Sequence, residues 1–299
     1  MDADHDIAAL LAWDTGGPLP QDSLQRVFAH PRLAEASRAL ARNMLEAGAA
    51  DHRLDGIMKD AGRYLASAWA AYLHGAGELT LPRLKEAGVA SGFLSSGRSR
   101  DLLNYLLHLG FIELTEQARA GTPARYALTP AFVTAWRSHL RAALGAARVI
   151  EPAVGPLLEG LDAPGTFAAF ARVQGAGLLE LSNQAAQTHP YVRIFMHRHA
   201  GTQVVWALLV DGEDGFPSGE AIPVAVAGLA RRFGVSRTHI KRMFDEAEQA
   251  GLISRTPEGA VRFEPAGREY IRWTYAAQLL ALLIAAARTT RTLRAHEPA

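Results

Sequence analysis

One order of sequence features occurs twice in this chain, and this repeat constrains the fold more than any other feature. The segment His108–Ile112 (HLGFI) aligns with Gln249–Ile253 (QAGLI), and Thr129–Ala131 (TPA) aligns with Glu264–Ala266 (EPA). The glycine and the proline of these segments are 20 residues apart in the first copy and 14 in the second. Because turns tolerate insertions at small cost, we expect the difference to lie in a turn. The chain is therefore predicted to contain two copies of one folding unit.

Hydrophobic periodicity, together with the positions of glycine and proline, predicts the same elements in both copies. In the first copy we expect helices at 61–75, 81–89 and 97–109, strands at 111–114 and 124–128, and a long helix at 130–150. In the second we expect helices at 202–210, 224–233 and 236–250, strands at 252–254 and 260–263, and a long helix at 265–288. The predicted fold class is mainly α with small β-wings, with two winged helix-turn-helix domains joined by and packed with long helices.

Prolines and glycines between 151 and 165 mark the predicted boundary between the two copies. Four segments follow from this boundary and from the repeat. We expect an N-terminal helical segment at 1–60, a first winged-helix domain at 61–150, a helical linker at 151–200, and a second winged-helix domain with a long C-terminal helix at 201–299.

The composition excludes several classes of protein. Hydrophobic residues make up 49% of the chain and charged residues 20%, which excludes a disordered chain. There is no cysteine, so disulfides, thiolate metal sites and cysteine nucleophiles are excluded. The first 14 residues lack the features of a secretory signal, and the apolar run 276–287 is shorter than the roughly 20 residues of a membrane span. We therefore expect a buried helix there and a cytoplasmic protein.

The segment Gly228–Phe244 (GLARRFGVSRTHIKRMF) has the pattern of a helix-turn-helix. Ala230 is small where two helices would cross, and Gly234 tolerates a positive φ in the turn. Ser236 is a favourable N-cap for the second helix. That helix would be buried by three apolar residues, Val235, Ile240 and Met243.

Basic and polar side chains occupy the positions that this pattern leaves exposed. The net charge is only +1, so any DNA contact must come from such a local patch. Side chains at the start of a recognition helix reach base edges in the major groove, and lysine and arginine release counterions from phosphates. The predicted DNA-binding residues are Arg231, Arg232, Ser236, Arg237, Thr238, His239, Lys241 and Arg242. The alternative is that these charges only solvate a helix face.

Residues 202–288 resemble the winged helix-turn-helix domains of bacterial regulators, with MarR-type repressors closest. The segments Arg125–Ala131 (RYALTPA) and Phe263–Arg268 (FEPAGR) are similar to the segment that follows the wing in that family. The resemblance implies binding to duplex DNA, usually as a dimer, with the third helix in the major groove and the wing on the backbone. It also implies that Arg255 and Arg262 flank the wing.

This chain differs from that family in three respects. It has two units, its first unit has a longer turn at 90–97, and its first 60 residues have no counterpart. The first unit nevertheless offers side chains suited to phosphates or bases, namely Ser96, Arg98, Ser99, Arg100, Asn104, Arg119 and Arg125. The alternative is a unit retained for packing only.

Other chemistry finds little support in the sequence. His189, His197, His199 and Asp211 do not have the spacing of a metal site, and no catalytic triad or phosphate loop is present. We therefore expect no enzyme activity, no cofactor and no metal. The crevice between the long helices is a candidate site for a small-molecule effector. Trp136, Trp206 and Trp273 could line it, or they could pack in the core.

The sequence thus predicts a sequence-specific double-stranded DNA-binding transcription regulator. A plasmid-type replication initiator is one alternative, and a winged-helix protein scaffold of a chromosome-organising complex is another. The final helix is too long for a small unit, so its apolar surface needs a partner. Either a second copy of the chain or the helix at 167–183 would serve, and we expect a homodimer.

Overall fold

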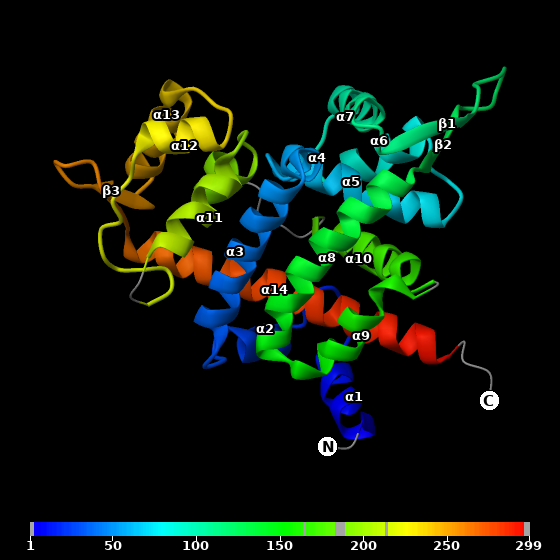
Figure 1. Ribbon diagram of the computed structural model, residues 1–299, viewed down its shortest axis with the longest axis horizontal. Coiled ribbons are helices and arrows are strands. Elements are labelled where there is room, and N and C mark those ends of the chain that lie inside the picture. Colours follow the sequence, from blue (N-terminus) through cyan, green and yellow to red (C-terminus); the bar gives the residue numbers. More distant parts are fainter. Residues whose placement is uncertain (1–2, 164, 183–188, 213–214, 296–299) are drawn as a thin grey trace.

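A computed structural model describes residues 3–163, 165–182, 189–212 and 215–295. They form a mainly helical fold with two small antiparallel sheets, as predicted (Figure 1). The helices of the first half are α1 (Ala3–Leu11), α2 (Gln21–Phe28), α3 (Leu33–Ala50), α4 (His52–Ile57), α5 (Ala61–Gly75), α6 (Leu81–Ala90), α7 (Ser96–His108) and α8 (Pro130–Ile150). They are followed by the turn η1 (Pro152–Val154), α9 (Gly155–Glu159), the turn η2 (Gly160–Asp162), α10 (Thr166–Ser182), the π-helical turn η3 (Val192–Met196), α11 (Gly201–Asp211), α12 (Val226–Arg232), α13 (Arg237–Gln249) and α14 (Pro265–Arg294). The strands are β1 (Ile112–Glu116), β2 (Arg125–Leu128), β3 (Ile253–Arg255) and β4 (Val261–Phe263).

One order of elements occurs twice along the chain. The first copy consists of α5, α6, α7, the hairpin β1–β2 and α8, and the second consists of α11, α12, α13, the hairpin β3–β4 and α14. In each copy, one residue before the second helix forms a β-bridge to the second strand of the hairpin: Thr80 to Arg125, and Ile222 to Val261. The same bridge therefore fixes each hairpin against its helices.

The two glycines of the aligned segments have the same backbone geometry. Gly110 has a φ of +66° and Gly251 a φ of +67°, a left-handed conformation in which glycine commonly ends a helix. The amide of the following residue, Phe111 or Leu252, donates to the carbonyl five residues earlier at 2.9 Å in both copies. The carbonyl of Phe111 or Leu252 in turn accepts a 3.0 Å hydrogen bond from the amide of the residue before the proline, Thr129 or Glu264. The sequence repeat is thus a repeat of structure.

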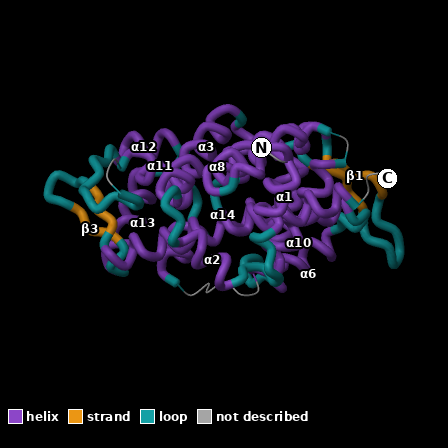
Figure 2. The backbone as a smooth tube through the Cα atoms, turned by 90° about the horizontal axis from the view of Figure 1, so that it is seen from below, coloured by secondary structure: helices purple, strands orange, loops and turns teal. Residues whose placement is uncertain are grey.

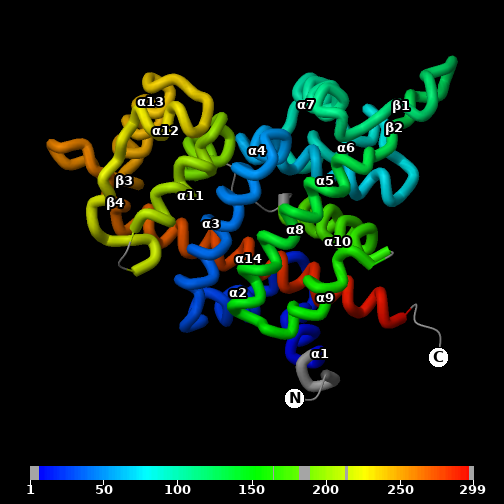
Figure 3. The backbone as a smooth tube through the Cα atoms, viewed as in Figure 1, coloured from blue at the N-terminus to red at the C-terminus, as the bar shows by residue number. Residues whose placement is uncertain are grey.

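Long helices join the two copies. α3 packs along α8, and α10 packs against both α5 and α14. Figures 1 and 3 show α14 running beneath both copies, and Figure 2 shows the two hairpins at opposite ends of the molecule. By length and composition α14 could cross a membrane, but 61% of its most apolar stretch is buried inside the protein. The helix predicted at 167–183, which is α10, supplies much of this cover.

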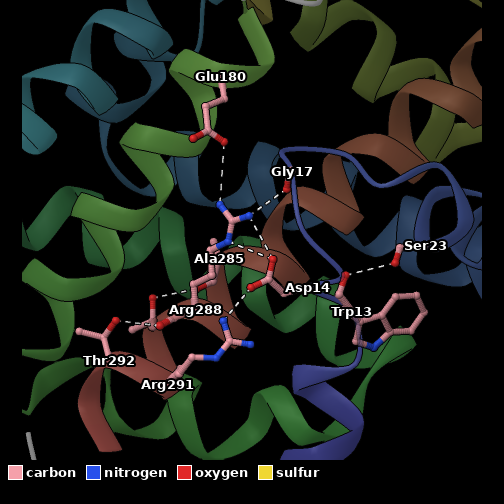
Figure 4. A network of polar contacts seen from close by, with 10 residues as sticks. Trp13, Asp14, Gly17, Ser23, Glu180, Ala285, Arg288, Arg291 and Thr292 are labelled. Carbon is pink, nitrogen blue, oxygen red and sulfur yellow. Dashed lines mark hydrogen bonds and ion pairs between the residues drawn. The ribbon is translucent and has the colours of Figure 1, made fainter. Parts of the chain in front are cut away.

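The N-terminal segment is bound to the end of α14. Asp14, in the loop after α1, accepts hydrogen bonds from Arg288 Nε at 3.1 Å and Arg291 Nη1 at 2.9 Å (Figure 4). Arg288 also donates to the carbonyl of Gly17 at 2.8 Å. Burial raises the pKa of Asp14, but the hydrogen bonds and positive charges of the two guanidinium groups outweigh burial and lower that pKa below its usual value. The N-terminal residues, which lie outside the repeat, therefore pack against the end of α14.

Candidate nucleic-acid interface

The segment from α12 to α13 has the local geometry that its sequence predicts. Gly234 has a φ of +64° in the turn, and the Val235 amide donates to the Ala230 carbonyl at 3.0 Å. The Ser236 hydroxyl caps α13 by accepting a hydrogen bond from the His239 amide at 3.0 Å. Ala230 is buried where the helices meet. The side chains of α13 that face the core are Ile240, Met243, Phe244 and Ala247. This turn fixes which face of α13 is presented to solvent.

The exposed face of this segment is cationic. Five basic side chains are exposed, namely Arg231, Arg232, Arg237, Lys241 and Arg242, and Ser236 and Thr238 are exposed among them. Within the part of the chain that the structure describes, none of the five is in an ion pair. The amide groups at the start of a helix add partial positive charge to the same place. The surface can therefore bind anions such as phosphates.

Acidic side chains in the rest of α13 are held by arginines from other segments. Arg255 lies 2.8 Å from Asp245 and donates to Glu248, while Arg193 and Arg198 bind Glu246. The hydrogen bond from Arg255 lowers the pKa of Glu248, and that from Arg198 lowers the pKa of Glu246. These pairs neutralise carboxylates that would otherwise oppose the cations at the start of α13. Nothing in the sequence pattern assigned this role to Arg193 and Arg198.

Two residues predicted to contact DNA from this unit have protein partners instead. His239 is half-buried, and its Nε2 donates to the His199 carbonyl at 2.8 Å. Arg255 forms ion pairs with Asp245 and Glu248, and these pairs connect β3 to α13. Arg262 on β4 is exposed, and no ion pair holds it among the described residues. In the hairpin, Arg262 is therefore the better-placed cation.

The first copy builds the same arrangement with fewer free charges. Its turn contains Gly92 at a φ of +70°, and Ser95 caps α7 by accepting from the Arg98 amide at 3.2 Å. Two residues separate Gly92 from the N-cap Ser95, against one between Gly234 and Ser236 in the second copy, so the predicted longer turn has one additional residue. The predicted contact residues Ser96, Arg98, Arg100 and Asn104 are exposed on α7.

One predicted contact in this copy is wrong. Ser99 is fully buried, and its hydroxyl donates to the Ser95 carbonyl at 3.1 Å. Its side chain lies on the same face of α7 as Leu102, Leu103 and Leu106, so it cannot reach a ligand in solvent. In this position Ser99 instead lies under α6, where an added Cβ on Gly88 would come within 2.7 Å of its hydroxyl.

The basic residues of the first copy are more often paired. Arg98 lies 3.4 Å from Asp60, and Arg125 donates to the Gly77 carbonyl at 2.7 Å and lies 3.7 Å from Glu116. Arg119 is exposed at the hairpin, where Glu113 and Glu116 are exposed as well. The second copy therefore has the stronger positive surface.

The helices α7 and α13 lie at the same edge of the molecule, and the hairpins lie at its opposite ends (Figures 1 and 3). A single chain thus presents the two corresponding helices on one side. The histidines considered for metal are apart from this edge or otherwise engaged, since His189 stacks on Tyr270 and His197 on Phe93. No group of three potential metal ligands occurs in the described residues.

Comparison with known proteins finds no matching family model, no matching curated protein and no matching solved structure. Function is therefore inferred from the geometry of this chain alone.

Proposed function

We propose that this protein is a cytoplasmic transcription regulator that binds double-stranded DNA through two winged helix-turn-helix units, of which the second is the main contact. One observation carries the proposal: Arg237, Lys241 and Arg242 are exposed at the start of a capped helix, and no carboxylate pairs with them in the described residues. Each unit has a helix, a bridging residue, two helices joined by a tight turn, and a hairpin. This is the order of a winged helix-turn-helix, in which the third helix enters the major groove.

In this proposal α13 enters the groove with Arg237, Thr238 and Lys241 toward base edges. Arg231, Arg232 and Arg242 contact phosphates on either side, and Arg262 follows the backbone from the hairpin. The helix α7 uses Ser96, Arg98, Arg100 and Asn104 on an adjacent stretch of the same duplex. Because α7 and α13 share one edge of the molecule, both can face one DNA (Figure 1).

Selection of bound genomic fragments, followed by titration of the selected duplex, tests the proposal. Arg237→Ala and Lys241→Ala should each weaken binding by about 1–3 kcal/mol, or roughly 5- to 150-fold in Kd. Arg242→Ala should weaken binding to all sequences alike and reduce the salt dependence by about one phosphate contact. Arg172→Ala, which removes an exposed arginine on α10, is the matched control and should leave Kd unchanged.

The outcome of the selection also separates the alternatives. Fragments upstream of genes support a regulator, whereas repeated sites within a plasmid origin would identify a replication initiator. If the wild-type chain retains no fragment at low salt, the DNA-binding proposal fails and a protein scaffold takes its place. If DNA is bound but both α13 variants bind it as tightly as wild type, the contact surface lies elsewhere.

A further inference from the structure

A cavity of about 590 Å³ lies between the two copies. Its lining residues come from α2, α3, α5, α8, α10, η3, α11 and α14. Most of the lining is apolar, including Leu40, Met44, Leu65, Val173, Met196 and Trp206. This volume lies within the range of about 300–1,000 Å³ that holds drug-sized molecules. Of the three tryptophans considered from the sequence, Trp206 lines the cavity. Trp136 is buried in the core, and Trp273 stacks on Phe28.

Three polar side chains of the wall form a short hydrogen-bonded chain. Gln174 Nε2 donates to the Tyr64 hydroxyl at 3.3 Å, and that hydroxyl lies 3.1 Å from His139 Nε2. We assign the tyrosine proton to the contact with His139 Nε2, which places the His139 proton on Nδ1. Burial lowers the pKa of His139 to about 4, so the ring is neutral at pH 7.

The two ends of this hydrogen-bonded series of side chains are a donor and an acceptor without partners. His139 Nδ1 and Gln174 Oε1 are buried, and neither has a hydrogen-bond partner among the described residues. Both residues line the cavity and are more than nine-tenths buried, with exposed fractions of 3% and 8%. A buried polar group without a partner costs about 1–3 kcal/mol, so a molecule that satisfied both would recover part of this cost.

The charged residues of the wall are already neutralised. Asp60 binds Arg63 at 3.2 Å and Arg98 at 3.4 Å, and Arg288 is held by Asp14. An ionised ligand would therefore lose its hydration without gaining a free counter-charge. The cavity suits a neutral, mainly apolar molecule.

The wall is connected to both helix-turn-helix segments. Met58 and Asp60 line the cavity, and Asp60 is the ion-pair partner of Arg98 on α7. Between them, Lys59 donates from Nζ to the carbonyl of Phe233, directly before the turn that leads to α13, at 2.9 Å. The residues 58–60 are thus in contact with the cavity, with α7 and with the turn before α13.

A second connection runs through η3. Met196 lines the cavity, and the next residue, His197, stacks on Phe93 in the turn before α7 with ring centroids 5.1 Å apart. Phe93 itself lines the cavity. The carbonyl of His199 accepts the hydrogen bond from His239 on α13. The lining of the cavity is therefore in contact with the supports of both helices.

We propose that this cavity binds a neutral, largely apolar small molecule that carries a hydrogen-bond acceptor for His139 and a donor for Gln174, and that its binding changes the positions of α7 and α13 together. The binding step stands on the cavity alone. Its effect on DNA affinity rests on the proposed function.

The test uses Nile red on the full chain. This neutral aromatic dye has a carbonyl that can accept from His139 and no donor for Gln174, so it tests the apolar cavity and the His139 contact. We expect saturable binding of one dye per chain, with enhanced and blue-shifted emission and energy transfer from Trp206 that Trp206→Phe reduces. Gly177→Phe should fill the cavity, because Gly177 lines it and an added Cβ would meet no atom within 4 Å. This variant should lose about tenfold or more in dye affinity, equivalent to about 1.4 kcal/mol. Gly75→Phe makes the same change at an exposed helix end with equal space and should bind like wild type.

Hydrogen exchange measures the connection without DNA. Saturation with the dye should change the exchange of amides at 91–99 and at 233–240 and leave those of the distant hairpin β1–β2 unchanged. Non-saturable dye binding, equal affinity of wild type and a folded Gly177→Phe variant, or unchanged exchange in both turns would overturn the proposal. Should Gly177→Phe not fold, the dependence of energy transfer on Trp206 decides the location.

A separate titration of the selected DNA with and without dye measures the regulatory effect. Coupling between two sites is typically about 5- to 150-fold, and we expect a change in Kd within that range. If the chain binds no DNA, the proposed function fails while the fluorescence and exchange results still decide the cavity. If DNA binds with equal Kd in both titrations, the regulatory effect is refuted while DNA binding stands.

Discussion

Asp60 contacts three groups through one carboxylate: an amide in the first turn of α5, the guanidinium of Arg63 and that of Arg98 on α7. One oxygen caps α5 by accepting from the Arg63 amide at 2.9 Å, and the other binds Arg63 Nε at 3.2 Å and Arg98 at 3.4 Å. Asp60→Asn keeps a side chain that can cap a helix but removes the charge. Asp60→Ala removes both.

The expected losses differ in size. Breaking a fully buried ion pair costs about 3–5 kcal/mol, but Arg63 keeps a hydrogen bond to the Gly56 carbonyl, so we expect about 2 kcal/mol for Asp60→Asn. Loss of the cap adds about 1 kcal/mol in Asp60→Ala. Arg98 is partly exposed, and Arg98→Ala should cost less than about 1 kcal/mol.

Urea unfolding followed by both fluorescence and circular dichroism gives these free energies where the two transitions coincide. Equal midpoints for Asp60→Asn and wild type, at equal m-value, would refute the assignment of the ion pairs as stabilising. Equal losses for Asp60→Asn and Asp60→Ala would refute the separate contribution of the cap.

Three further predictions concern the titration of the cavity wall, the turn and the mass. Because burial lowers the pKa of His139 from 6.5 to about 4, the unfolded chain takes up this proton first. The free energy of unfolding should therefore fall by up to about 1.4 kcal/mol per pH unit from pH 6.5 down to about 4. In a pH series of urea titrations, His139→Phe should reduce that slope, and an unchanged slope would contradict the burial of a neutral ring. Gly234→Ala should destabilise by about 1–2 kcal/mol through its positive φ alone, since its added Cβ would meet no atom within 4 Å. Gly97→Ala within α7 should instead stabilise by about 0.5–1 kcal/mol, and equal signs for the two variants would speak against the turn geometry. Light scattering at micromolar concentration should give one chain of 32.2 kDa, because α10 covers the surface of α14 for which the sequence suggested a second copy. A mass of two chains would show the predicted homodimer.

The order of the elements and most of their bounds were predictable because glycine, proline and capping residues mark them, whereas α14 continues to Arg294, beyond its predicted end at 288. Helices α5 and α8 begin and end where the sequence indicates, and the glycines at 110 and 251 end helices in both copies. These signals act locally and depend little on distant packing. The burial of Ser99 could have been predicted by the same kind of argument, since residues 99, 102, 103 and 106 lie on one face of a helix.

The partners of individual side chains were not predictable in this way. Arg255 was assigned to DNA because it is basic and near the hairpin, yet the reversal of the chain at Gly251 brings it to Asp245 and Glu248. The cavity is formed by residues from Pro18 to Arg288, and no local pattern brings those segments together. The bridge from Lys59 to Phe233 joins residues 174 positions apart.

Because α7 and α13 belong to one chain, their amino-acid sequences need not be identical. In a symmetric dimer of DNA-binding subunits, the two recognition helices carry the same side chains, so the preferred DNA sequence is a palindrome. Here α7 begins SGRSRDLLN and α13 begins RTHIKRMFD, and each sequence can change without the other. Under the proposed function, such a chain recognises a target whose two halves differ, and it does so with a fixed left and right orientation on the duplex.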